Sequence, residues 1–412
     1  MRLMVVTLCL LATNAFAAES SWPEFRGPRG NGHAAGKLPT NWSETKNVVW
    51  KIKTDGQGWS TPVVWENQIW MTSATLDGRK MFAVSFDGKT GKEIKRINLF
   101  NVPKPQVKNK LNSYASPSPV VADGRLYAYF GTYGIACLDI KRGRVIWKRR
   151  DVKLDHQEGP GSSPVIYGRR LFLQCDGRDK QFVAVLNSSD GRMLWKNARS
   201  IDLKKVPDYS RKAFSTPYVI RTPDGPRMIS SAAQGCYCYN PDTGKEVWRV
   251  RYKGFSAVPR PVSRGNLAFV VTTFAQPQIW AVRMDLKGDI TDKKNSVKWR
   301  YTRNGPSTCS PIRVGVRLMF VSDKGVVTCI DSRNGKRLWV KRVGGNFCAS
   351  PIAADGLVYF FDRDGKATIF RAGDKPEVVA TNKLNEGMMA SPSVIGGRLL
   401  LRTTSHLYCI GK

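Results

Sequence analysis

The sequence predicts an all-β fold, an eight-bladed β-propeller built from four-stranded antiparallel blades. Two recurring phrases support this prediction. The first is a small residue followed by proline and an apolar strand, with the prolines at Pro62, Pro119, Pro164, Pro217, Pro261, Pro311, Pro351 and Pro392. Their spacing of 40 to 57 residues is typical of propeller blades, each of which is one repeating unit.

The second phrase is an Asp or Asn, a Gly four residues later, and a Trp four residues after that. It occurs at Asp139/Gly143/Trp147, Asn187/Gly191/Trp195, Asn240/Gly244/Trp248 and Asp331/Gly335/Trp339. The Asp or Asn starts a turn, and the Gly supplies a left-handed backbone conformation. The Trp then falls on an outer strand, where we expect it to fill the space between successive blades.

Each unit can be divided into four strands. Proline starts the first strand, where its missing N–H group is tolerated. Turns such as Asp123-Gly124 and Asp355-Gly356 predict a tight hairpin to the second strand. The eighth unit, 389–412, has no turn and no Trp for an outer strand, but "NVVWKIK" at 47–53 precedes the first unit. We therefore expect this N-terminal strand to close the last blade and remove its open edge.

The N-terminus predicts export. Arg2, the apolar run 3–12 and the small-x-small sequence at 15–17 form a secretory signal at 1–17. We expect an N-terminal arm at 18–47 and the propeller domain at 48–412. No segment reaches the ~20 apolar residues of a transmembrane helix, and Cys9 does not follow a small residue, which argues against a lipid anchor. The expected product is a soluble monomer in the periplasm or outside the cell.

Eight cysteines follow the signal sequence. Cys137, Cys238, Cys329 and Cys409 occupy equivalent positions in four repeats, so they should lie in separate sheets. We expect buried, unpaired thiols. Cys309 and Cys348 both precede inner strands of neighbouring units, and a bond between them remains open.

The charge is strongly positive, with 66 Lys and Arg against 32 Asp and Glu and a formal net charge of +34. Basic runs lie at 95–110, 141–153 and 333–342, mostly on predicted outer strands. Such a field attracts polyanions. Because an exported protein does not meet nucleic acid, the expected partner is an envelope protein or an acidic surface polymer.

With these motifs, the chain resembles the pyrroloquinoline-quinone-like (PQQ-like) β-propellers over about 365 residues from Val48. The first unit departs from the motif at Lys95, the fifth is interrupted around 285–299, and the seventh lacks it. The lead-in "WPEFRGPRGNG" at 22–32 and the closing "SHLYCIG" resemble exported planctomycete-type members, which are similar to the outer-membrane assembly factor BamB. The resemblance is specific for the fold, but the fold hosts both dehydrogenases and scaffolds.

A quinoprotein dehydrogenase of this family would need an acidic calcium cluster, a general-base Asp and a Trp floor under the quinone. The predicted axis-facing residues are Trp59, Tyr114, Ser162, Phe214, Arg260, Thr308, Phe347 and Met389. None is a carboxylate, although hard cations prefer oxygen clusters. Asp176, Asp323, Asp362 and Asp364 each lie beside a Lys or Arg in the sequence, which favours ion pairs. We therefore expect no catalytic residue, no metal and no cofactor; calcium-bound PQQ is the alternative.

The predicted binding site is a central funnel on the loop face. Its residues are Trp59, Tyr114, His156, Arg178, Phe214, Arg260, Lys324, Phe347 and Arg363. His33, His156 and His406 belong to different units, so neither a zinc site nor a catalytic triad is expected. The sequence thus predicts an exported, non-catalytic binding or scaffold protein with a BamB-like role in envelope or outer-membrane assembly. The alternative is a PQQ-dependent alcohol or sugar dehydrogenase.

Overall fold

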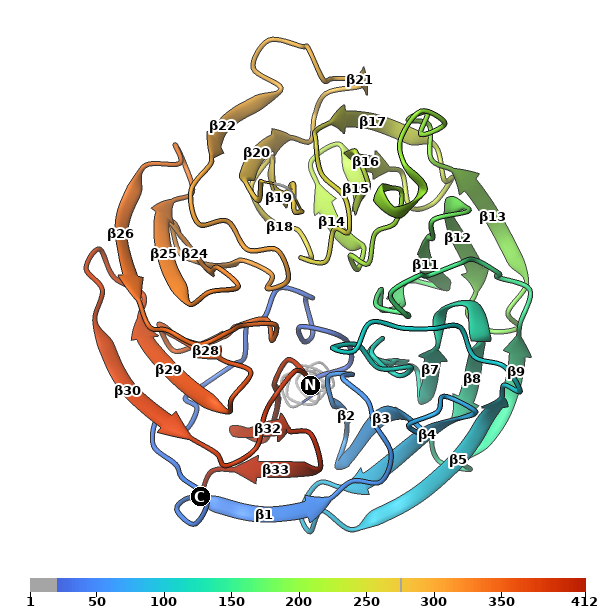
Figure 1. The fold of residues 1–412 in the computed structure, drawn as a ribbon, viewed down its shortest axis with the longest axis vertical. Coiled ribbons are helices and arrows are strands. Elements are labelled where there is room, and N and C mark those ends of the chain that lie inside the picture. Colours follow the sequence, from blue (N-terminus) through green and yellow to red (C-terminus); the bar gives the residue numbers. More distant parts are fainter. Residues whose placement is uncertain (1–20, 275) are drawn as a thin grey trace, which may run out of the picture.

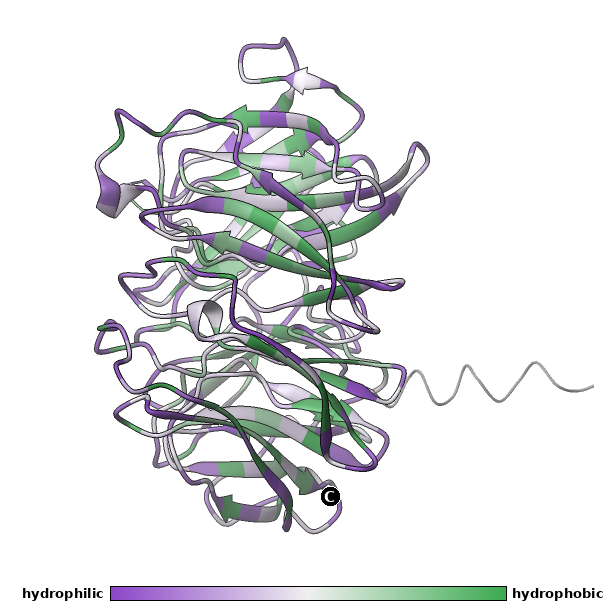
Figure 2. Ribbon diagram, turned by 90° about the vertical axis from the view of Figure 1, so that its right-hand side faces the viewer, coloured by the Kyte–Doolittle hydropathy of each residue, from purple (hydrophilic) through white to green (hydrophobic). Residues whose placement is uncertain are grey.

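Eight β-sheets form a closed ring around a central axis in the computed structural model, which describes residues 21–274 and 276–412 (Figure 1). The predicted eight-bladed propeller is confirmed. Apolar residues concentrate in the strands, and polar residues concentrate in the loops on both faces (Figure 2). The predicted signal sequence at 1–17 lies outside the described residues.

The first four blades, from inner to outer strand, are as follows. Blade 1 contains β2 (Val63–Trp65), β3 (Gln68–Ala74), β4 (Lys80–Asp87) and β5 (Glu93–Asn101); blade 2 contains β6 (Val120–Ala122), β7 (Arg125–Tyr129), β8 (Ile135–Asp139) and β9 (Arg144–Arg149). Blade 3 contains β10 (Val165–Tyr167), β11 (Arg170–Asp176), β12 (Gln181–Asn187) and β13 (Met193–Ala198); blade 4 contains β14 (Tyr218–Thr222), β15 (Gly225–Ala232), β16 (Gly235–Tyr239) and β17 (Glu246–Arg251). Two short 3-10 helices, η1 (Gly131–Tyr133) and η2 (Asp208–Ser210), lie in the loops.

The remaining blades follow the same order. Blade 5 contains β18 (Val262–Arg264), β19 (Leu267–Val271), β20 (Ile279–Arg283) and β22 (Val297–Tyr301); blade 6 contains β23 (Ile312–Val314), β24 (Arg317–Val321), β25 (Val326–Asp331) and β26 (Arg337–Arg342). Blade 7 contains β27 (Ile352–Ala354), β28 (Leu357–Phe361), β29 (Lys366–Arg371) and β30 (Val378–Lys383); blade 8 contains β31 (Ser393–Ile395), β32 (Arg398–Arg402), β33 (His406–Ile410) and β1 (Val48–Lys53).

Strand β1 closes the ring, as predicted. It pairs antiparallel with β33, and Trp50 lies opposite Cys409. Trp50 is 9% exposed, and its indole Nε1 donates to the carbonyl oxygen of Gly88 in blade 1 at 3.2 Å. A single outer strand therefore completes blade 8 and also contacts blade 1.

The Gly and Trp of the recurring motif meet across blade boundaries. Gly191 of blade 3 lies under the ring of Trp147 from blade 2, where an added Cβ would come within 2.8 Å of the indole. Its φ of +76° is also in the left-handed region. The same contact joins Gly91 to Trp50, Gly244 to Trp195 and Gly335 to Trp299. The motif is thus a packing device in which each Trp covers the turn of the next blade.

Lys95 takes the place of this Trp in blade 1. An added Cβ on Gly143 would meet Lys95 Cδ and Cε at 2.7 Å, so the aliphatic part of the lysine covers the glycine. Its Nζ donates to the carbonyl oxygens of Ile140 at 3.4 Å and Lys141 at 3.2 Å. The space that a Trp occupies in other blades is therefore filled here by the long apolar stem of a lysine.

The interrupted motif of blade 5 forms a strap onto blade 4. Strand β21 (Gly288–Asp289) pairs in parallel with β17, which makes blade 4 five-stranded. Ile290 is fully buried beneath it, and Arg249 forms an ion pair with Asp289 at 3.1 Å. The insertion covers an outer edge that would otherwise be open.

The hydrophobic core lies between neighbouring blades. Tyr127 of β7 and Leu171 of β11, for example, belong to one cluster of buried side chains. All eight cysteines of the described part are free thiols; seven are buried and Cys348 is half-buried.

Candidate functional site

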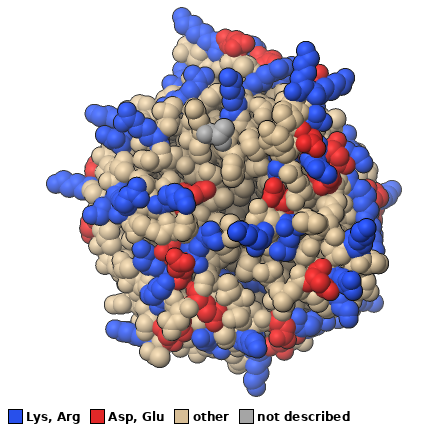
Figure 3. Space-filling model, viewed as in Figure 1, with Lys and Arg blue, Asp and Glu red and all other residues tan. Residues whose placement is uncertain are grey.

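A central cavity of about 480 Å³ lies where the loops that lead into the inner strands converge on the axis. Figure 3 shows the hollow near the centre of the face formed by these loops. Apolar side chains make up most of its wall: Phe25, Trp59, Leu111, Phe214, Phe255, Phe274 and Met389. These residues come from six different loops and from the N-terminal arm, so the cavity exists only in the closed ring.

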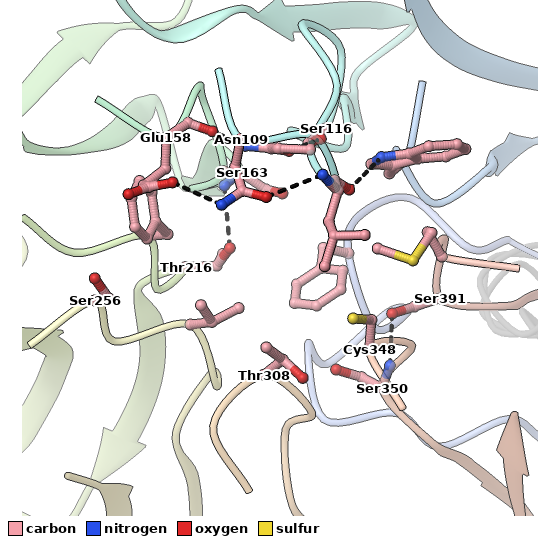
Figure 4. Close-up of a pocket in the computed structure, with 18 of the residues that line it drawn as sticks. Asn109, Ser116, Glu158, Ser163, Thr216, Ser256, Thr308, Cys348, Ser350 and Ser391 are labelled. Carbon is pink, nitrogen blue, oxygen red and sulfur yellow. Dashed lines mark hydrogen bonds between the residues drawn. The ribbon is translucent and has the colours of Figure 1, made fainter. Parts of the chain in front are cut away.

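A ring of hydroxyl groups surrounds the axis at the start of the inner strands. In six of the eight repeats, the N–H of the residue before the repeat proline donates to the hydroxyl of the equivalent residue in the next blade. The six bonds run from Thr61 to Ser118, Ser118 to Ser163, Ser163 to Thr216, Arg260 to Ser310, Ser310 to Ser350 and Ser350 to Ser391, at 2.9–3.0 Å. Figure 4 shows two of them at the edge of the cavity. At six of the eight blade boundaries, the residue before the proline therefore links one blade to the next.

Arg260 interrupts this ring, because it has no hydroxyl to offer to the preceding blade. Its guanidinium is 1% exposed and bonds instead to the arm: Nη1 donates to the carbonyl oxygen of Phe25 at 2.7 Å and to Glu24 Oε1 at 3.2 Å. Nε donates to the carbonyl oxygen of Pro217 at 3.0 Å. Burial raises the pKa of Glu24, while the charge of Arg260 opposes that rise.

The N-terminal arm crosses the axis beneath the cavity (Figure 1). Trp22 pairs with Val64 of β2, and the Pro23 carbonyl accepts from the N–H of Val121 in β6 at 2.8 Å. The chain then passes Arg260, and Gly32 accepts from the N–H of Ala353 in β27 at 2.9 Å. Because these contacts lie on opposite sides of the ring, the arm closes this end of the channel, and Phe25 forms the floor of the cavity.

One polar wall faces the apolar side. Glu158 accepts from Asn109 Nδ2 at 2.9 Å and forms an ion pair with Lys212 at 3.7 Å. The lysine Nζ also donates to Gln157 Oε1 at 2.9 Å. Burial lowers the pKa of Lys212, and the nearby Glu158 opposes that shift. Among the described residues that line the cavity, Glu158 is the only carboxylate, and its charge is already paired.

Two of the predicted funnel residues line this cavity, Trp59 and Phe214. Tyr114 turns away from it, because its hydroxyl bonds the carbonyl of Gln106 at 3.0 Å and its ring packs against Tyr133. Phe347 is buried with the core between blades 6 and 7. Both aromatic rings therefore stabilise loops and blades instead of facing the axis.

The predicted basic funnel residues do not line the cavity either. Arg260 is buried against the arm, and Arg178 is exposed, with Asp155 at 2.7 Å. Lys324 is exposed and reaches Asn346, while Arg363 is half-buried. Of the described positively charged side chains, Lys212 is the one that reaches the cavity. We predicted these residues near the axis from their positions in the repeats. Their side chains, however, point away from the cavity.

His156 is buried and does not line the cavity, in contrast to its predicted place in the funnel. It is 6% exposed, and its Nε2 accepts from the N–H of Thr132 at 2.9 Å. Burial lowers the pKa of His156 to about 4. It therefore acts as a neutral structural acceptor in the loop after β9.

The ion pairs predicted for the acidic residues near the axis are only partly confirmed: Asp176 and Asp362 form ion pairs, the latter with Lys366 at 3.9 Å, whereas Asp323 binds backbone N–H groups. Asp176 pairs with the buried Arg199 at 2.8 Å and not with the adjacent Arg178. Asp323 accepts from the N–H groups of Ser307 at 2.9 Å and Thr308 at 3.2 Å. Sequence neighbours project from a strand end in different directions, so adjacency in sequence did not identify the partner.

Several cavity residues were missed from the sequence. Phe25 lies in the arm, Phe255 and Phe274 lie in loops of blades 4 and 5, and Asn109 lies in the loop before β6. The sequence held one signal for the arm that carries Phe25. Residue 260, which binds this arm, is the only residue before a repeat proline that is neither Ser nor Thr.

The described residues contain no group of three or more His, Cys, Asp or Glu arranged to hold a metal ion. Likewise, within 21–274 and 276–412 no helix has the length and apolar character needed to cross a membrane.

Comparison with known proteins places this ring of blades in a family. The family model described as outer membrane protein assembly factor BamB, a PQQ-like repeat model, matches residues 103–208, 179–314 and 293–377. Together these segments span about two thirds of the chain. The chain belongs to this BamB-type family of PQQ-like repeat propellers.

Curated relatives of the BamB-type chain are distant. It is 21% identical over 249 residues to BamB from Shewanella oneidensis, a match that covers 56% of this chain and 57% of that protein. It is 20% identical over 266 residues to tetrathionate hydrolase from Acidithiobacillus ferrooxidans, covering 55% of this chain and 48% of that protein. The chain thus matches about half the length of these relatives, one an assembly factor and the other an enzyme.

Solved structures show the same fold in both kinds of protein. BamB from Moraxella catarrhalis superposes with a TM-score of 0.60 and 13% identity, covering 89% of this chain and 99% of that one. A europium-containing methanol dehydrogenase gives a TM-score of 0.68 with 11% identity, covering 93% and 89%. At these identities the likeness defines the fold alone, and the function has to be argued from the cavity.

Proposed function

We propose that this propeller is an exported, non-catalytic binding protein of the cell envelope, with a BamB-like role as a scaffold in outer-membrane assembly. In this proposal the central cavity receives an apolar side chain of a partner protein. The observation that carries the proposal is the composition of the cavity: aromatic and aliphatic walls, with polar groups that are already bonded to one another.

The cavity lining does not fit a calcium-held quinone. Such a group would need several carboxylate or carbonyl oxygens directed at one point. Here the single described lining carboxylate, Glu158, is engaged by Asn109 and Lys212. The remaining polar side chains of the lining are hydroxyls, amides, the Lys212 ammonium group and the Cys348 thiol, none of which favours calcium. These features support a binding role over quinone-dependent dehydrogenation.

Exposed apolar residues surround the cavity mouth. Leu111, Tyr209 and Phe274 are 41%, 52% and 47% exposed, and Phe255 joins Tyr209 to Phe274 through ring contacts of 6.2 and 5.8 Å. Aromatic residues around a pocket are typical of the centres of protein interfaces. They favour a protein segment, in which one side chain enters the cavity and its neighbours rest on the rim.

Unpaired lysines lie in the same two loops as the rim residues Leu111 and Tyr209. Lys104 and Lys110 lie in the loop before β6, and Lys204 and Lys205 lie in the loop before η2. None of the four forms an ion pair with the described residues. The partner segment in our proposal therefore carries acidic residues beside its apolar anchor.

The test uses fluorescent peptides in which a central Trp or Leu is flanked by Asp and Glu. We expect saturable binding by the wild-type protein and a loss of at least about tenfold in affinity for the variant Trp59→Ala/Phe214→Ala, since each large apolar contact contributes ~1–2 kcal/mol. A control variant, Ile94→Ala/Ile146→Ala, changes exposed outer-strand residues and should bind normally. Saturable, calcium-dependent binding of PQQ with alcohol-dependent dye reduction would refute the proposal.

A further inference from the structure

A second recess lies at the opposite end of the inner strands from the cavity. It is a groove of about 950 Å³ on the face where the arm enters. Ser391, just before β31, lines the cavity, whereas Gly396 and Gly397, just after β31, line the groove. The two recesses therefore open on different faces of the disc.

The arm and two hairpins build this groove. Arg29 to Lys37 of the arm form one side, and Arg313 of β23 and the Gly396-Gly397 turn of blade 8 form the other. The arm is held in place by a bridge between His33 and Ala353, and His33 Nε2 donates to the carbonyl oxygen of Arg313 at 2.7 Å. The groove is thus a built recess that extends from blade 6 to blade 8.

The charges of the groove are all positive. Arg29, Lys37 and Arg313 line it, and no described Asp or Glu does. Arg29 and Lys37 are exposed and have no hydrogen bond or ion pair with the described part of the chain. Turn arginines elsewhere are neutralised locally, as in Arg142 with Asp139 at 3.0 Å and Arg192 with Asp190 at 2.7 Å. The groove therefore brings cations from three parts of the chain together without a carboxylate among its described lining residues.

The pKa shifts of two groove residues reflect this positive charge. Burial lowers the pKa of His33, and the charges of Arg26, Arg313 and Arg29 lower it further. Burial likewise lowers the pKa of Arg313, with a further contribution from Arg264. Several cations thus act on one region that lacks a compensating anion.

We infer that this groove binds an anionic oligosaccharide, whose sulfate, phosphate or carboxylate groups contact Arg29, Lys37 and Arg313. The volume exceeds that of a single anion, and the cations come from separate parts of the chain, so a ligand with several negative groups along an extended backbone fits best. Arginine binds such oxyanions in bidentate fashion, and lysine acts as a point charge. Asn31 and the exposed backbone at Gly36 and Gly396 add polar contacts for sugar hydroxyls.

Other polyanions fit less well. None of the large apolar side chains exposed on the described surface lines the groove, so it lacks the anchors that hold a protein in a lipid surface. Trp22 is the one Phe, Tyr or Trp among its described lining residues, and at 2% exposed it cannot act as a stacking platform for bases. A sugar polymer requires neither feature.

The experiment measures binding of fluorescent dextran sulfate oligomers to the full-length mature protein by anisotropy at physiological salt. We expect the variant Arg29→Gln/Lys37→Gln to lose about tenfold or more in affinity, because each charge-assisted contact is strong relative to a neutral one. The matched control is Lys298→Gln/Lys336→Gln, which removes the same charge from exposed outer positions and should change the affinity less than about twofold. Both variants alter exposed side chains, and equal melting temperatures would verify folding.

Five further outcomes separate the sources of the signal. Neutral dextran should not bind, and inorganic sulfate should compete only at much higher concentration. An equal loss in both variants would overturn the inference, because it would assign binding to the overall positive field. Groove-dependent binding to phosphatidylglycerol vesicles, or to a single-stranded oligonucleotide as tightly as to dextran sulfate, would also overturn it in favour of a lipid surface or a nucleic acid.

Discussion

Arg260 holds Phe25 in position: its Nη1 donates to the Phe25 carbonyl oxygen at 2.7 Å, across 235 residues of sequence. This bond fixes the floor of the central cavity to the wall of the ring. The same guanidinium pairs with Glu24 and bonds the Pro217 carbonyl. Arg260 stands where the other repeats have a Ser or Thr hydroxyl, and this same residue fastens the arm.

We expect Arg260→Ser to loosen the arm. The substitution removes three buried hydrogen bonds and leaves Glu24 without its cation, which should lower the free energy of unfolding by ~2–4 kcal/mol. Chemical denaturation measures the loss, and limited proteolysis should cut the variant within residues 21–47. Adding Glu24→Gln should restore part of the stability. A variant as stable and as protease-resistant as the wild type would contradict the fastening role.

Removal of the closing strand should destabilise the whole ring. Trp50→Ala deletes an indole that contacts blades 8 and 1, and loss of a buried Trp costs ~3–5 kcal/mol. Deletion of residues 47–53 should cost more and lead to association, because the edge of β33 becomes open. Calorimetry and light scattering test both variants. A monomeric deletion variant with an unchanged melting temperature would disprove the closure.

Thiol chemistry should report access to the cavity. Cys348 is the one described cysteine that lines it, and burial raises its pKa, so labelling requires alkaline pH. We expect a small maleimide to modify the native protein at a single site and eight thiols to react after denaturation without reductant. Cys348→Ser should remove the native label. Two or more disulfides found by mass mapping would show that the thiols are paired instead.

His156 should make stability depend on pH. Its folded pKa of about 4 lies below the usual value of 6.5, so the unfolded chain takes up a proton first as the pH falls. The stability is fully present above about pH 6.5 and is lost between 6.5 and 4, by ~3 kcal/mol for this group. Unfolding free energies measured across this range should fall less steeply for His156→Gln than for the wild type. Identical slopes would contradict the assignment.

Restoring the motif residue in blade 1 should stabilise the protein. Lys95→Trp places an indole over Gly143, as in the other Gly–Trp pairs, and should raise the free energy of unfolding by ~1 kcal/mol through added apolar burial. Lys89→Trp, in the exposed turn of the same blade, is the control and should have no such effect. A decrease in stability with Lys95→Trp, measured by urea denaturation, would show that the site is shaped for lysine.

The sequence predicted the fold well because its signals are local and repeated. Each proline marks an inner strand, and each Gly–Trp spacing marks a turn and an outer strand, so counting these features located the blades. The unpaired "NVVWKIK" segment also identified the closing strand. These features depend on backbone geometry near the residue itself, which a single sequence records directly.

The cavity was harder to predict because it depends on side-chain direction. Trp59 and Phe214 face the axis, whereas Tyr114 and Phe347, at equivalent places, turn into loops and core. Periodicity gives the face of a strand residue but not the direction of a loop residue. Phe25 was missed because nothing local shows that an arm folds back across the channel.

The pairing of β1 with β33 has a kinetic consequence. Val48 and Ile410 are partners, so nearly the entire chain must be synthesised and its blades formed before this contact can arise. Loop-closure entropy grows slowly, by about 0.6 kcal/mol for each doubling of length, but contacts between distant residues slow folding markedly. Closure is therefore expected as a late step, and its reversal as the event that limits unfolding. The protein should persist through long native lifetimes even where its equilibrium stability is ordinary.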